Sequence, residues 1–352
     1  MLLQTLITVA ALLAWQGAPS AEPVGDLPAC MRSIDRDWIK QCPRTLREFA
    51  RTRSWLPSES AIAELQRVQP TVEALCRSLR EPCPWTVDPL SMVLDTKSID
   101  DWVTILDADS RRLARFNERV AALDRIVAMI DLAGVVGSVP RADFQRVAVR
   151  LQSAAGRRVE AFLPLFGDAA MAARVCDALL ACKKAQDQAL SSCIATERAR
   201  WIARPTERVR AGATGSELLV AARLEPSAAI LKSNEYPLAR LKGDALLVEL
   251  RTGDAYFDAV ESAWRAPNAA ALISELQRRA DAGEFGAWVA AARPEFLVVR
   301  SDLDRARTPL DALVDLARVQ AAGGSSPVPK TTEDEPPPNE ERQRRSPRKV
   351  KR

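Results

Sequence analysis

Histidine is absent from this chain of 352 residues. Its absence excludes the Ser–His and Cys–His nucleophile pairs, histidine as a general acid or base, histidine metal ligands and the histidine pH switch. An enzyme built from this chain would have to use paired carboxylates, a Ser–Lys pair, tyrosine or a lone cysteine. The sequence therefore favours a non-catalytic protein, and we assign no catalytic residue, cofactor or metal site.

Two further patterns are missing. No CxxC pair occurs, and no asparagine is followed two positions later by Ser or Thr. Irregular cysteine spacing without histidine disfavours a zinc site. The lack of an N-glycosylation sequon disfavours an ordinary eukaryotic ectodomain and is neutral for a bacterial periplasmic protein.

Long apolar runs are scarce, and the clearest extends from Leu2 to Trp15, followed by small residues up to Ala21. This run of about 14 residues is shorter than the roughly 20 that a spanning helix needs. The pattern predicts a signal peptide over residues 1–21, cleaved near Ser20 or Ala21. We expect an exported protein, secreted or periplasmic, without a transmembrane anchor. The alternative is a buried N-terminal helix.

Length and composition indicate a largely globular chain. Apolar residues make up 47% of the sequence, which is enough for a substantial core, and the length suggests two domains. The formal net charge is only +4. Such a balance disfavours nucleic acid as the main ligand of the folded part, where a basic face would be expected.

Seven cysteines fit an oxidising compartment and predict two or three disulfides, with one thiol left over. Prolines force a turn between Cys76 and Cys83, so these two can pair, and Cys30 and Cys42 are a second plausible pair. Eleven residues separate Cys182 from Cys193 on one predicted helix, which places them about 16 Å apart and prevents a bridge. The disulfide candidates are Cys30, Cys42, Cys76, Cys83, Cys176, Cys182 and Cys193.

The strongest helical pattern covers residues 98–133. Apolar residues there recur in steps of three and four, which predicts one continuous helix with a single apolar seam, begun by Ser98 and ended by Gly134. Asp109 alone breaks the seam. We interpret it as a polar register element or as the cap of a second helix that starts at Ser110.

The fold class predicted from these patterns is mainly α. Helices over 58–80, 141–163 and 168–204 would cover the seam and form a disulfide-stapled bundle from about residue 30 to 204, within a helical domain spanning 22–204. A second domain, 205–321, would be helical or a small mixed α/β unit.

Three short apolar runs in the second domain leave its class open. Residues 218–220, 245–250 and 296–299 fit buried strands or buried segments of helices equally well. Helices are predicted to start at Asp254, at Asn268 and at Thr308–Pro309, from their capping residues.

The last segment, 322–352, is predicted to be a disordered Pro-rich tail, first acidic and then basic. Its basic end is a candidate contact for an acidic surface such as anionic lipid, glycan or nucleic acid, and the alternative is a solvated tail without a partner. The candidate interaction residues are Arg342, Arg344, Arg345, Arg348, Lys349, Lys351 and Arg352.

An acidic-aromatic stretch from Gly253 to Asp258, followed by Trp264 to Pro267, carries one resemblance. Together with a cleavable signal, early cysteines and a basic Pro-rich tail, it resembles the herpesvirus envelope glycoprotein L subunits. The resemblance implies a soluble subunit on the virion or host cell surface that partners a membrane-anchored fusion glycoprotein.

The sequence as a whole predicts an exported, soluble helical protein that binds or scaffolds another protein, with the basic tail as a contact element. Two alternatives are kept. One is the soluble viral envelope subunit, and the other is an exported enzyme that works without histidine, through a buried Asp, Glu or Lys in a cleft.

Overall fold

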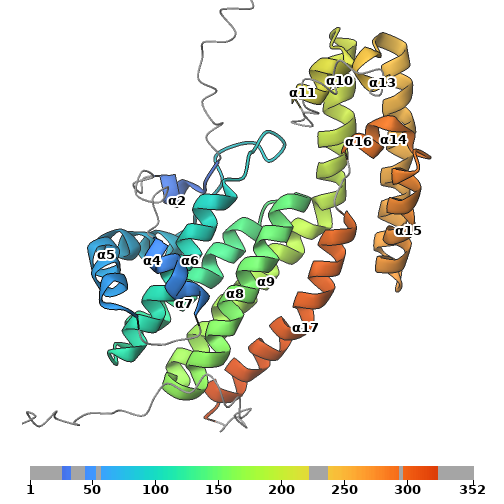
Figure 1. The fold of residues 1–352 in the computed structure, drawn as a ribbon. Coiled ribbons are helices and arrows are strands. Elements are labelled where there is room, and N and C mark those ends of the chain that lie inside the picture. The colour runs from blue at the N-terminus through green and yellow to red at the C-terminus, as the bar shows by residue number, and fades with distance from the viewer. Residues whose placement is uncertain (1–25, 33–43, 53–56, 222–236, 293–295, 324–352) are drawn as a thin grey trace, which may run out of the picture.

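A computed structural model describes residues 26–32, 44–52, 57–221, 237–292 and 296–323 (Figure 1). The predicted signal peptide 1–21, Cys42 and the tail from residue 324 onward lie outside the described residues. Throughout the described part the chain is helical, and no strand is present there. The predicted mainly α class is confirmed.

Five long helices build the first core: α5 (Glu59–Arg80), α6 (Thr96–Arg115), α7 (Arg119–Gly137), α8 (Ala142–Phe166) and α9 (Ala169–Arg198). Two short N-terminal helices, α2 (Ala29–Arg32) and α4 (Arg44–Arg51), pack at its edge. Ser58 caps α5 by accepting a hydrogen bond from the Ala61 amide, and Asp168 caps α9 in the same way through Met171. The predicted helices 58–80 and 141–163 are confirmed to within a few residues.

The predicted seam helix is wrong, because α6 and α7 are two helices joined by a tight turn. Asn117 takes a left-handed conformation with φ of 63°, and the Glu118 amide donates to the Leu113 carbonyl at 2.9 Å, which closes the end of α6. The apolar spacing runs through this turn by coincidence. Phe116 and Val120, assigned to the seam, are instead 54% and 59% exposed.

The ends of the predicted seam helix also differ from the structure. Asp95, rather than Ser98, is the N-cap of α6, and its side chain accepts from the Ser98 amide at 3.0 Å. Gly134 does not end α7, which continues to Gly137. A Cβ at Gly134 would lie 3.3 Å from Cys182 Cα, so glycine there permits close packing of α7 against α9.

Asp109 is not the cap of a second helix at Ser110, because α6 continues through both residues. It lies inside α6, is 1% exposed, and forms ion pairs with Arg112 at 2.8 Å and with Arg125 of α7 at 2.8 Å. Both arginines are themselves buried. Asp109 therefore joins the two helices through a buried charge cluster.

A second core forms around α14 (Gly243–Trp264), α15 (Ala269–Asp281) and α16 (Gly286–Ala292). It also takes in the π-helical turn η1 (Ala199–Ala203) and the helices α10 (Arg204–Arg210), α11 (Gly215–Ala221) and α13 (Pro237–Arg240). Asn268 is the N-cap residue of α15, as predicted. The predicted helix 168–204 is interrupted by η1, which follows α9 directly.

The strand alternative for residues 218–220, 245–250 and 296–299 is wrong, because these runs lie in α11, α14 and α17 (Phe296–Ala321). Short apolar runs contain too few residues to distinguish the 3.6-residue period of a helix from the two-residue period of a strand. The helix starts predicted at Asp254 and Thr308 are also wrong. Helix α14 begins at Gly243 and α17 begins at Phe296, so Pro309 lies inside α17.

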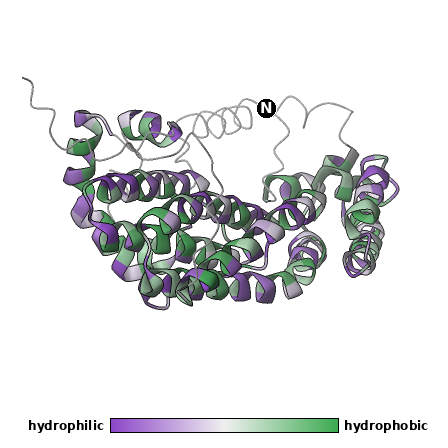
Figure 2. Ribbon diagram, turned by 90° about the horizontal axis from the view of Figure 1, so that it is seen from below, coloured by the Kyte–Doolittle hydropathy of each residue, from purple (hydrophilic) through white to green (hydrophobic). Residues whose placement is uncertain are grey.

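Helix α17 contacts both cores (Figure 1). Phe296 is buried in the second core, whereas Leu310, Leu313 and Ala317 are buried in the first. Figure 2 shows hydrophobic residues along the inner faces of the helices and hydrophilic residues along many of the outer ones. The last helix therefore returns to the bundle that the earlier helices build.

The disulfide joins Cys30 to Cys83, with a Cα–Cα distance of 5.5 Å, so the predicted Cys76–Cys83 and Cys30–Cys42 pairs are wrong. The segment that carries α2 lies against the loop after α5, where the Ala29 amide donates to the Pro84 carbonyl at 3.3 Å. Among the described cysteines this is the single bridge, fewer than predicted. The remaining four are free and buried: Cys76, Cys176, Cys182 and Cys193.

Among the described helices, none combines the length and apolar character required to cross a bilayer.

Candidate binding groove

A groove of about 1230 Å³ lies between α6, α8 and α17. Its walls hold more positive than negative side chains: six arginines against four carboxylates, with no lysine. The arginines are Arg141, Arg146, Arg150, Arg157, Arg200 and Arg305, and the carboxylates are Asp100, Asp143, Glu160 and Asp302.

Three of these arginines form a stripe on α8. Arg146, Arg150 and Arg157 follow one another at spacings of four and seven, which keeps them on one side of a helix. The opposite side of α8 carries buried Phe144, Ala148 and other core residues. At about 1.5 Å per residue the stripe extends over roughly 16 Å.

The ion pairs across the groove are open to solvent. Arg150 contacts Asp100 at 2.7 Å, with side chains 57% and 48% exposed, and Arg146 approaches Asp302 of α17 at 4.0 Å. Partial burial raises the pKa of Asp100 above its ordinary value, while the charge of Arg150 acts against that rise. Exposed pairs of this kind contribute little stability, so a ligand can displace them at small cost.

Two arginines of the groove have no counterion. Arg157 on α8 and Arg305 on α17 are exposed and form no ion pair or hydrogen bond with any described residue. They belong to the two helices that form opposite walls. The groove therefore offers two uncompensated guanidinium groups that face the same space.

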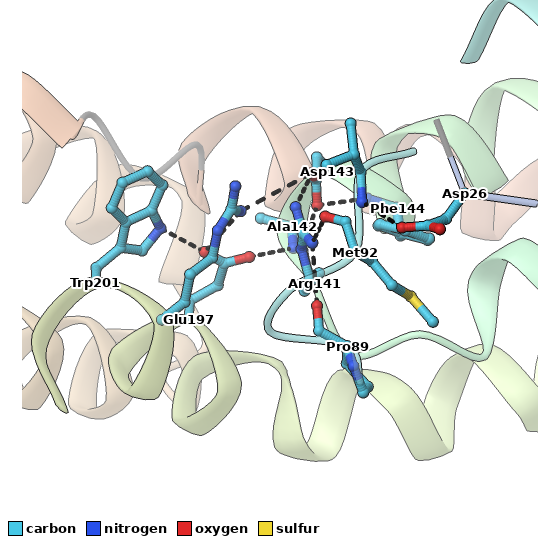
Figure 3. A network of polar contacts seen from close by, with 11 residues as sticks. Asp26, Pro89, Met92, Arg141, Ala142, Asp143, Phe144, Glu197 and Trp201 are labelled. Atoms are coloured by element: carbon cyan, nitrogen blue, oxygen red, sulfur yellow. Dashed lines mark hydrogen bonds and ion pairs between the residues drawn. The ribbon is translucent and has the colours of Figure 1, made fainter. Parts of the chain in front are cut away.

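One end of the groove is closed by a polar cluster around η1 (Figure 3). A π-helical turn shifts the side chains that follow it relative to a regular α-helix, and such turns are frequent at functional sites. Here the turn carries Arg200, whose guanidinium lies 3.9 Å from Asp143 and 3.7 Å from Glu197. Burial lowers the pKa of Arg200, and Glu197 opposes that shift.

Glu197 is the buried centre of this cluster. It is 1% exposed and accepts hydrogen bonds from the Ala142 amide at 2.9 Å and from Trp201 Nε1 at 2.6 Å. Helix α8 has no side-chain cap of its own, so the Glu197 carboxylate caps it from α9. Burial raises the pKa of Glu197 above its ordinary value, against the opposing effects of Arg200 and the Ala142 amide.

Arg141 holds the adjacent loop in place. Its guanidinium donates to the carbonyl oxygens of Pro89 and Met92 and pairs with Asp143 (Figure 3). The same group lies 5.0 Å from the centre of the Phe144 ring. Arg141 is 1% exposed, so it serves to position this end of the groove, whereas Arg200 has the more accessible side chain.

The structure does not assemble the sequence-predicted candidates into one site. The free cysteines are separately buried, and burial raises the pKa of both the Cys76 and the Cys182 thiol to about 11, which makes them poor nucleophiles. Within the described ranges no three Cys, Asp or Glu side chains are arranged to hold a metal ion. The predicted tail contacts, Arg342 to Arg352, lie outside the described residues.

The groove was missed by reasoning from the sequence. The spacing of Arg146, Arg150 and Arg157 on the predicted helix 141–163 was a usable signal, because it places three cations on one side. Arg305 is distant from that helix in the chain, and its position opposite Arg157 follows only from the return of α17 to the bundle.

Comparison of the chain with models of known protein families, with curated proteins and with solved structures finds no match.

Proposed function

We propose that this is an exported helical binding protein that holds an acidic segment of a partner protein in the groove between α8 and α17. The observation that carries the proposal is the pair of uncompensated arginines, Arg157 and Arg305, on opposite walls of the groove. Guanidinium groups bind carboxylates with paired hydrogen bonds, and an unpaired cation next to a cavity favours an anionic ligand.

An extended peptide suits the groove better than nucleic acid does. The stripe from Arg146 to Arg157 is elongated, which matches several carboxylates in succession better than a single anion. The chain, with a formal net charge of only +4, also lacks the strong basic excess of nucleic-acid-binding domains.

The hydrogen bonds of the buried acid Glu197 also favour binding over catalysis. Glu197 has the raised pKa expected of a general acid, but its two oxygens are engaged by the Ala142 amide and by Trp201. It therefore supports the end of the groove rather than reaching into it. The enzyme that works without histidine remains an alternative prediction.

The viral envelope subunit also remains an alternative. Tyr256 and Phe257 of the acidic-aromatic stretch are fully buried in the second core. Their role in the fold accounts for this pattern without a partner. Export through the predicted signal peptide and binding of an acidic surface by the tail are further parts of the proposal.

The groove is tested with a fluorescein-labelled hexaglutamate peptide, followed by fluorescence anisotropy on the full chain. We expect binding that weakens as salt is raised, and a loss of about tenfold or more in the double variant Arg157→Gln/Arg305→Gln. The matched control is Arg210→Gln/Arg251→Gln, which removes two exposed arginines of α10 and α14 outside the groove.

Equal loss of affinity in both double variants would show that the peptide responds to net charge alone. That result, or the absence of any binding by the parent chain at low salt, would refute the groove as the binding site.

A further inference from the structure

A second cavity, of about 450 Å³, lies between α9, α14 and α17. Helix α17 contributes to the walls of both hollows: Arg300, Leu303 and Arg307 line this cavity, Arg305 and Pro309 line the arginine groove, and Ala306 and Leu310 line both. The volume falls within the range of small-molecule pockets.

Part of the cavity wall is apolar, beside polar and charged side chains. Leu190 and Ile194 of α9, Leu303 and Leu310 of α17, and the indole of Trp264 on α14 line it. Such a lining favours a ligand with an aliphatic or aromatic body, because burial of apolar surface supplies most of the affinity.

The charges at the rim are paired with one another. Arg300 contacts Asp304 at 3.1 Å, and Arg307 contacts Asp187 at 3.4 Å. Arg265 and Glu261 form a third pair at 2.6 Å. Because these charges are already compensated, the rim does not select an ionic ligand.

One polar group in the wall lacks a partner. Gln186 is 5% exposed, and its Oε1 accepts a hydrogen bond from Gln152 Nε2 at 2.9 Å. Its Nε2 is buried and makes no hydrogen bond to any described residue. An unsatisfied buried donor is costly, so a ligand that brings an acceptor to Gln186 would gain both a bond and the relief of that cost.

We infer that this cavity binds a small uncharged amphipathic molecule, whose apolar body contacts Ile194, Leu303 and Trp264 and whose carbonyl oxygen accepts a hydrogen bond from Gln186 Nε2. The site adjoins the arginine groove, with which it shares Gln152, Ala306 and Leu310, but it does not depend on the proposed partner. It uses neutral hydrogen bonding and apolar burial, whereas the groove uses charge.

Two uncharged fluorescent probes test this site on the full chain. Prodan carries a naphthalene body and a ketone oxygen, whereas N-phenyl-1-naphthylamine has a similar apolar body without a carbonyl. We expect both to bind with a blue shift in emission. Gln186→Met should weaken prodan by about 3- to 10-fold and leave N-phenyl-1-naphthylamine unchanged, since only the ketone uses the amide donor. In this variant Gln152 Nε2 keeps its contact to Cys182 Sγ at 3.3 Å.

Filling the cavity supplies a second measurement. Ile194→Trp should abolish binding of both probes, and Leu180→Trp on the exposed side of α9 should leave both affinities at the parent value. Leu303→Trp replaces Ile194→Trp if the latter does not give a cooperative thermal transition. Absence of probe binding by the parent chain, equal weakening of both probes by Gln186→Met, or undiminished binding in the filled variants would overturn the inference.

Discussion

At the residue scale, Asp109 decides how α6 and α7 meet. Its two oxygens are divided between Arg112 on the same helix and Arg125 on the next, at 2.9 and 2.8 Å from the respective Nε atoms. Arg125 also contacts Cys76 Sγ at 3.7 Å, which links the cluster to α5. Three helices are therefore joined through one carboxylate that water does not reach.

We predict that Asp109→Leu destabilises the protein by about 3–5 kcal/mol, because two buried guanidinium groups lose their closest carboxylate and only Arg125 has another, Glu73 at 3.9 Å. Urea unfolding followed by circular dichroism measures the change. Asp315→Leu on α17 is the matched control: its carboxylate is 75% exposed and lies 3.7 Å from Arg318, so we expect a change within about 0.5 kcal/mol. A gain in stability on Asp109→Leu would mean that the position behaves as ordinary core.

At the element scale, the turn between α6 and α7 changes one long rod into a helical hairpin. The turn depends on Asn117, because most L-residues resist positive φ and asparagine tolerates it. The Asn117 side chain also accepts a hydrogen bond from Arg119 Nε at 2.9 Å in an exposed position. The hairpin brings Asp109 and Arg125 together although 16 residues separate them.

We predict that Asn117→Ala lowers stability by about 1 kcal/mol, since alanine must adopt the left-handed conformation. Asn117→Gly should be close to neutral, because glycine adopts positive φ without steric cost. Differential scanning calorimetry of the two variants separates the backbone effect from the lost contact to Arg119. Equal melting temperatures for Asn117→Ala and Asn117→Gly would contradict a role for the left-handed turn.

At the scale of the whole molecule, two long-range connections organise the chain. The Cys30–Cys83 bridge joins segments 53 residues apart, and α17 brings the last described helix back against α8 and α9. Lys183 of α9 pairs with Asp311 of α17, and Gln320 donates to the Leu163 carbonyl at 2.7 Å. The groove and the cavity both exist because α17 is held in this position.

We predict that the expressed chain is exported, loses residues up to about 21, and keeps the Cys30–Cys83 bridge. N-terminal sequencing and peptide mass mapping before and after reduction measure these properties. The double variant Cys30→Ser/Cys83→Ser should lose about 2–4 kcal/mol of stability, because the loop that the bridge closes is long. Cys76→Ser is the comparison, since it removes a thiol without removing the bridge. An uncleaved N-terminus would refute export, and a Cys76-containing disulfide would refute the pairing.

Part of the candidate site could be read from the sequence. The 3.6-residue period puts Arg146, Arg150 and Arg157 on one side of the helix predicted at 141–163, although these arginines were not recognised as a site from the sequence. The opposite wall could not be foreseen, because the pairing of α8 with α17 depends on packing between segments far apart in the chain. The same holds for Gln186, whose missing partner becomes evident only once Gln152 and Gly137 are placed against α9.

The sequence by itself determined that the chain is mainly helical, where α5 and α9 begin, and that histidine chemistry is excluded, because local periodicity, capping residues and composition act over short range. It left the class of residues 205–321 open between helices and a mixed α/β unit. Tertiary structure decided that the apolar pattern of residues 98–133 belongs to two helices, since a single left-handed residue outweighs a regular spacing. It also decided that Cys30 pairs with Cys83 and that Asp109 forms ion pairs with two buried arginines. These outcomes depend on which distant parts of the chain come into contact. Apolar burial, charge pairing and loop closure determine those contacts only when the whole chain has folded.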